Sequence, residues 1–70
     1  MIHIHFINKP IIDRKATGRS IYEARKEAGM TQQEVADRTK WTQQYISLIE
    51  SGMCALSDNT IKKIEKAIKQ

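Results

Sequence analysis

The side chains best suited to chemistry in this sequence are uncharged amides and hydroxyls that recur at helical spacing. In residues 42–51, TQQYISLIES, the apolar positions take one face of a helix and leave Gln43, Gln44 and Ser47 on the other. The only formal charge in this segment is Glu50. A helix face that meets only water usually carries charged residues. This composition therefore indicates a surface that makes directed hydrogen bonds.

Hydrogen bonds of this kind match the edges of base pairs in the major groove of DNA. Gln can bond N6 and N7 of adenine together, Ser can approach several base edges, and apolar atoms can meet the thymine methyl group. We therefore predict base contacts by Gln43, Gln44 and Ser47, with apolar contacts from Tyr45 and Leu48. No nucleophile with a base and no paired carboxylates converge in the chain, so an enzyme is not expected.

Three helix starts of the same design would position this face. Thr31, Thr42 and Ser57 are each suited to accept a hydrogen bond from a free backbone N–H of the first turn. Glu34 follows Thr31 at the spacing of a capping box. Apolar residues also flank each of the three starts as a hydrophobic staple. Thr17 is a weaker fourth start.

These signals predict an all-α fold. Gly29 and Gly52 stand where a helix can end in a left-handed residue. The expected helices cover about 18–28, 32–39, 43–51 and 58–69. The second and third, joined by a turn of about three residues, would form a helix-turn-helix unit.

Composition and charge limit the class of protein. Seventy residues make one small domain, and a net charge of +4 suits an acidic partner. The single Cys54 cannot form an intrachain disulfide, and no zinc spacing occurs, so we expect no cofactor. The first residues do not resemble a signal peptide, and the apolar runs are shorter than a membrane span needs. We expect a cytoplasmic protein.

The segment GRSIYEARKEAGMTQQEVADRTKWTQQYISLIESG closely resembles the phage-repressor and Cro-like helix-turn-helix family, also called the Xre family. The likeness continues through LSDNTIKKIEKAI and covers about residues 18–68. It implies a lambda-repressor-like domain and a sequence-specific, usually dimeric regulator that binds double-stranded DNA. It also implies that Arg25 and Glu50 pair across the domain. Lys40 departs from the pattern, because glycine usually holds this turn position.

Backbone contacts are expected around the reading helix. Helix amides would bind phosphate at the N-terminus of residues 43–51. The side chains expected to contact the DNA backbone are Gln32, Lys40, Thr42, Ser51, Lys62 and Lys63.

The first residues have a different pattern. Residues 2–7 alternate in polarity, which predicts a β-strand with Ile2, Ile4 and Phe6 on one face. A lone strand needs a partner for its backbone groups, so we expect it to pair with the same strand of a second chain. Residues 1–16 would then be a dimerisation strand with a linker, and residues 17–70 the DNA-binding domain. The predicted function is a dimeric repressor of an inverted-repeat operator.

Two alternatives remain for this segment. It could be a basic arm that uses Lys9, Arg14 and Lys15 on the DNA backbone or minor groove. It could instead add a strand to a partner protein, such as a toxin or an antirepressor, which would make the chain an antitoxin or adaptor. Histidines at a chain end are usually solvated, so no metal site is expected at His3 and His5.

Overall fold

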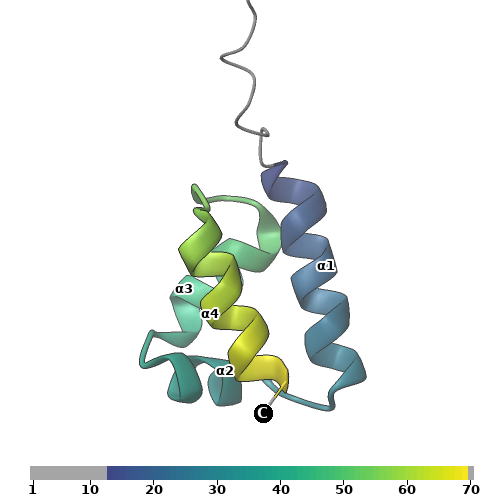
Figure 1. Cartoon of the computed structure of the whole chain (residues 1–70), viewed down its shortest axis with the longest axis vertical. Coiled ribbons are helices and arrows are strands. Elements are labelled where there is room, and N and C mark those ends of the chain that lie inside the picture. Colours follow the sequence, from purple (N-terminus) through teal and green to yellow (C-terminus); the bar gives the residue numbers. More distant parts are fainter. Residues whose placement is uncertain (1–12, 70) are drawn as a thin grey trace, which may run out of the picture.

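Four helices make up residues 13–69, the part of the chain that the computed structural model describes (Figure 1). They are α1 (Arg14–Glu27), α2 (Gln32–Thr39), α3 (Gln43–Ser51) and α4 (Asp58–Lys69). The all-α class and the ranges predicted for the last three helices are confirmed. The strand predicted at 2–7, with its proposed interface residues Ile2, Ile4 and Phe6, lies outside the described residues.

The first helix begins earlier than predicted. Asp13 is its N-cap, and the Asp13 carboxylate accepts a hydrogen bond of 3.1 Å from the backbone N–H of Ala16. Asp is among the strongest N-caps, and here it replaces Thr17, which lies inside the helix. The prediction of a helix start at residue 18 was therefore wrong. Residues 14–16, which the sequence assigned to a linker, belong to α1.

The predicted caps start the other three helices. Thr31 and Glu34 form the capping box, because each side chain accepts a hydrogen bond from the backbone N–H of the other residue. The hydroxyls of Thr42 and Ser57 each accept a hydrogen bond from the backbone N–H three residues later. A cap is typically worth about 1 kcal/mol, which matters for helices as short as α2 and α3.

The turn between α2 and α3 is closed by a residue other than glycine. Lys40 has a φ of 67°, and its N–H donates to the carbonyl oxygen of Ala36. A left-handed lysine costs about 1 kcal/mol relative to glycine. Lys40, Trp41 and Thr42 form this turn, which sets the direction in which α3 leaves α2.

The core lies where all four helices meet. Val35, Ala36, Ile46, Ile49 and Ile64 are completely buried. Trp41 packs against both clusters of buried residues in this core, one formed by α1, α3 and α4 and the other by α2, α3 and α4 with Met30. None of the four described helices is long and apolar enough to span a bilayer.

Thr39 fills an apolar position without leaving a polar group unpaired. Its side chain is almost completely buried, and its hydroxyl donates within its own helix to the carbonyl oxygen of Val35 at 2.9 Å. Because the hydroxyl is satisfied, burial leaves the methyl group to pack like an apolar side chain.

Gly18 allows α1 to pass directly beside the C-terminal end of α3. A Cβ atom at this position would lie 2.8 Å from the carbonyl oxygen of Glu50 and closer still to that of Ile49. Only glycine fits this approach without a shift of one helix. The contact holds the C-terminal end of α3 against α1.

Candidate nucleic-acid interface

The outer face of α3 carries the amides and hydroxyls that the sequence placed there. Gln43, Gln44 and Ser47 are exposed, and Leu48 beside them is 46% exposed. The opposite face is fixed in the core, because Ile46 and Ile49 are completely buried. The structure therefore places these four predicted base-contact residues on one accessible surface.

Tyr45 differs from the other predicted base-contact residues. It is only partly exposed, and its ring meets the Trp41 ring edge-on with centroids 5.0 Å apart. The aromatic ring therefore packs against the turn and the core. Its contribution to an interface would be limited to its exposed edge.

Glu50, at the C-terminal end of α3, anchors a buried polar network. Arg25 Nε donates to Glu50 Oε2 at 2.6 Å, and Arg25 Nη2 donates to Glu50 Oε1 at 3.0 Å. Arg25 Nη1 donates to the carbonyl oxygen of Met30 at 2.8 Å. The Arg25 and Glu50 side chains are 8% and 5% exposed, so the ion pair implied by the family resemblance is formed in a shielded place.

Arg25 and Glu50 form a bidentate ion pair, in which two N–H groups of the guanidinium bond the two carboxylate oxygens. The hydrogen bonds to Glu50 raise the pKa of Arg25, against the opposing effect of burial. The guanidinium therefore stays charged at any working pH. The pair ties the end of α1 to the end of α3 and so helps to hold α3 in its orientation.

Gln32 extends this network to the first residue of α3. Its Nε2 donates to Glu50 Oε1 at 3.0 Å, and its Oε1 accepts from Gln43 Nε2 at 3.4 Å. The sequence assigned Gln32 to phosphate, but one N–H and the carbonyl oxygen of this amide are used inside the protein. Its second N–H remains available to a ligand. Gln32 therefore positions Gln43 as well as presenting a donor of its own.

A polar hollow of about 450 Å³ opens beside these two amides. Its lining includes Lys26, Thr31, Gln32 and Gln43, which belong to the end of α1, the start of α2 and the start of α3. Sequence reasoning missed Lys26, which also lies near the ring of Tyr22. Only the packing of α1 against α3 brings this lysine to the hollow. In the sequence, only the position of Lys26 next to Arg25 could have indicated that it lies near this network.

The other residues predicted to contact the DNA backbone lie at separate places on the surface. Lys40 is exposed in the turn before α3, and the Ser51 hydroxyl donates to the carbonyl oxygen of Leu48 at 3.1 Å. Lys62 and Lys63 line a different hollow, on the side of α4. They do not line the hollow beside Gln32 and Gln43.

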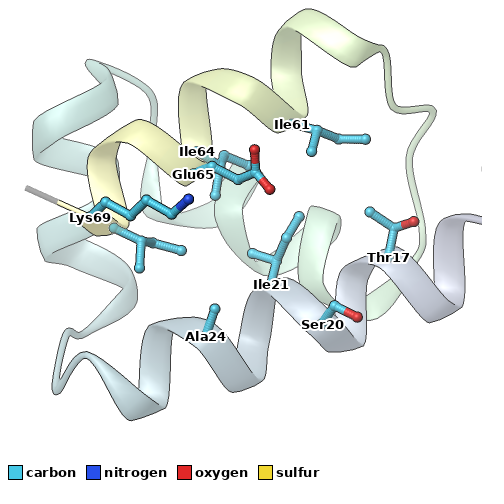
Figure 2. A pocket seen from close by; sticks show the side chains of 9 residues that line it. Thr17, Ser20, Ile21, Ala24, Ile61, Ile64, Glu65 and Lys69 are labelled. Carbon is cyan, nitrogen blue, oxygen red and sulfur yellow. The ribbon is translucent and has the colours of Figure 1, made fainter.

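An apolar hollow lies between α1 and α4 (Figure 2). Its volume is about 180 Å³, and no residue of α3 lines it. Ile21 projects into it from α1, facing Ile61 and Ile64 of α4 (Figure 2). Within residues 13–69, no group of three or more potential ligand residues could hold a metal ion.

Comparison with known proteins adds one match. A family model described as helix-turn-helix matches residues 21–69, a stretch that contains the second half of α1 and all of α2, α3 and α4. No curated protein and no solved structure matches the chain.

Proposed function

The chain belongs to the helix-turn-helix family of the Cro/C1 type, and we propose that it is a dimeric repressor that reads an inverted-repeat operator through α3. Membership of this family makes it a DNA-binding transcription regulator. Its proposed place of action is the cytoplasm, and its proposed effect is to block a promoter by occupying it.

The uncharged, exposed face of α3 supports this proposal most directly. With α3 in the major groove, Gln44 and Ser47 would bond base edges, and Leu48 would meet a thymine methyl group. Gln43 would read a base with its amide already oriented by Gln32. Because this amide is held before binding, less rotamer entropy is lost when it contacts DNA.

Phosphate contacts would fix the register of α3 in the groove. The N-terminus of α3 presents free backbone N–H groups, and Thr42 is exposed beside them. The second N–H of Gln32 and the Lys26 ammonium would bind a phosphate at the polar hollow. Lys40 would contribute from the turn before α3, and Ser51 would contribute from the other end of α3 by turning its hydroxyl from the Leu48 carbonyl oxygen to the phosphate.

Gln44→Ala tests the reading role. We expect it to weaken binding to the cognate operator by about 1–3 kcal/mol and to leave binding to random-sequence duplex almost unchanged, because only the base contact is lost. Fluorescence anisotropy on both duplexes measures this difference. Gln33→Ala is a suitable control, since Gln33 lies on α2 and its amide bonds Asp37. Equal losses on operator and random DNA would exclude base reading by Gln44.

Dimerisation is proposed because one reading helix covers little DNA. The nine residues of α3 span roughly 14 Å, which corresponds to about 4 base pairs. Two copies on successive turns, roughly 34 Å apart, would supply the missing specificity. Ile2, Ile4 and Phe6 are the proposed interface, paired about a two-fold axis.

The solution mass tests this arrangement. We expect light scattering to give the mass of two chains for the full-length protein and of one chain for a version that starts at Ile12, which keeps residues 13–69 intact. A full-length monomer would contradict the proposed dimer. It would favour the second candidate, an antitoxin or adaptor whose N-terminal strand binds a partner protein and whose DNA binding serves autoregulation.

A further inference from the structure

A hollow of about 480 Å³ between α2 and α4 is lined by four cations. Arg38 comes from α2, and Lys62, Lys63 and Lys66 come from α4, with Ala67 between them. No acidic residue lines this hollow. The two ion pairs found within the described residues, Arg19–Glu23 and Arg25–Glu50, do not involve any of the four.

Two of these cations are held in place by the fold. Arg38 Nη1 donates to the carbonyl oxygen of Ala67 at 2.9 Å, which joins the end of α2 to the end of α4. Lys63 Nζ lies 4.9 Å from the centroid of the Trp41 ring. Such a contact favours a fixed position for the ammonium group. The hollow is therefore partly organised before any ligand binds.

Helix dipoles account for only part of this cluster. Arg38 and Lys66 lie in the last turns of their helices, where a positive charge is favourable. Lys62 and Lys63 lie in the first half of α4 and gain nothing from that effect. Four cations around one hollow repel each other, and a bound anion would relieve this repulsion.

One contact links this hollow to the turn before α3. Lys63 lies over Trp41, and Trp41 directly precedes Thr42, the N-cap of α3. The major groove is about 12 Å wide, and a helix with its side chains nearly fills it. The structure beside the start of α3 would therefore face the phosphates that form a wall of the groove.

We propose that Arg38, Lys62, Lys63 and Lys66 form a phosphate-binding site for the DNA backbone beside the groove that α3 enters. This inference rests on the proposed function and extends it, because it adds Arg38 and Lys66 to the interface. It also places four of the cations that would give the salt dependence on α2 and α4, since the exposed face of α3 carries no cation.

The test compares two variants that lose the same charge. Lys62→Gln/Lys66→Gln removes two cations of the site and leaves the Lys63–Trp41 contact intact. Arg19→Gln/Lys69→Gln removes two exposed cations elsewhere, one on α1 and one at the α1–α4 hollow. Binding of each full-length variant to a random-sequence duplex is measured over a range of salt concentrations, because phosphate contacts do not depend on sequence. Thermal unfolding checks that both variants fold.

We expect Lys62→Gln/Lys66→Gln to lose about tenfold in affinity and to reduce the slope of log K against log salt by about two, as for the loss of two phosphate contacts. The Arg19→Gln/Lys69→Gln control should lose less than about threefold, through long-range charge alone. Equal losses in both variants would overturn the site. Absence of duplex binding by the wild-type protein would instead remove the proposed function, and this inference with it.

A second ligand separates DNA from free anions. Binding of inorganic tripolyphosphate is measured for the wild-type protein and for Lys62→Gln/Lys66→Gln. Loss of tripolyphosphate binding together with a tenfold loss on the duplex supports a site for backbone phosphate. Loss of tripolyphosphate binding with duplex binding at the control level would show a site for free polyphosphates and overturn the assignment to DNA.

Discussion

Replacing Arg25 with alanine is expected to lower the free energy of unfolding by about 3–5 kcal/mol, which approaches the total stability of a domain this small. The change leaves the Glu50 carboxylate almost buried and bonded only to Gln32. It also removes the donor to the carbonyl oxygen of Met30. An unpaired charge in such a place is costly because water cannot replace the lost partner. Urea unfolding followed by circular dichroism measures the loss.

The exposed ion pair of α1 provides the matched control. Arg19 Nε lies 3.2 Å from Glu23 Oε2, but the two side chains are 76% and 59% exposed. Arg19→Ala should therefore cost less than about 0.5 kcal/mol. Arg25→Lys should recover little stability, because a single ammonium cannot make the bidentate bond to Glu50 and the bond to Met30 together. Similar losses from Arg25→Ala and Arg19→Ala would contradict the structural role of the buried pair.

Gly18→Ala is expected to have the second largest effect, a loss of about 1–3 kcal/mol or more. Alanine normally stabilises a helix interior by about 1 kcal/mol relative to glycine, so helix propensity predicts the opposite sign. Here the added Cβ would meet the carbonyl oxygens of Ile49 and Glu50, which are backbone atoms and cannot rotate away. The two helices would have to separate, and the Arg25–Glu50 pair would be disturbed with them. Chemical unfolding again gives the size of the loss.

Gly29→Ala is the control for Gly18→Ala, because it introduces backbone strain without a close contact. Gly29 has a φ of 72°, and a Cβ there would meet nothing within 4 Å. The expected cost is about 1 kcal/mol, from the left-handed conformation alone. A Gly18→Ala variant that is as stable as the wild-type protein would show that α1 and α3 can separate freely, against the close packing described above.

Local signals predicted most of the helices, because caps act within a few residues. Thr31, Thr42 and Ser57 each had a side chain of the right type directly before an apolar periodic segment, and all three cap a helix. The start of α1 was mispredicted because both Asp13 and Thr17 are suitable caps. The turn of α1 before Thr17 lies beside the C-cap of α3, because a Cβ at Gly52 would come within 3.0 Å of the Cα of Lys15, and such a contact has no local sequence signal.

The site was predictable only where it follows helix periodicity. The polar face of α3 follows from which residues are buried, so the exposure of Gln43, Gln44 and Ser47 could be predicted. The use of Gln32 to hold Gln43 could not, because it depends on how α2 crosses α3. The position of Lys62 and Lys63 depends on the rotation of α4, which its buried face sets through Ile64 and Ala67. These contacts between distant segments have no local sequence signal.

The central claim is that α3 reads a specific DNA sequence. The most direct measurement is repeated selection of duplexes from a random-sequence library by the wild-type protein, followed by sequencing. We predict enrichment of one motif with two inverted half-sites about one helical turn apart, and a loss of preference at one position of each half-site for Gln44→Ala. Binding that retains duplexes without enriching any motif would contradict sequence-specific reading by α3.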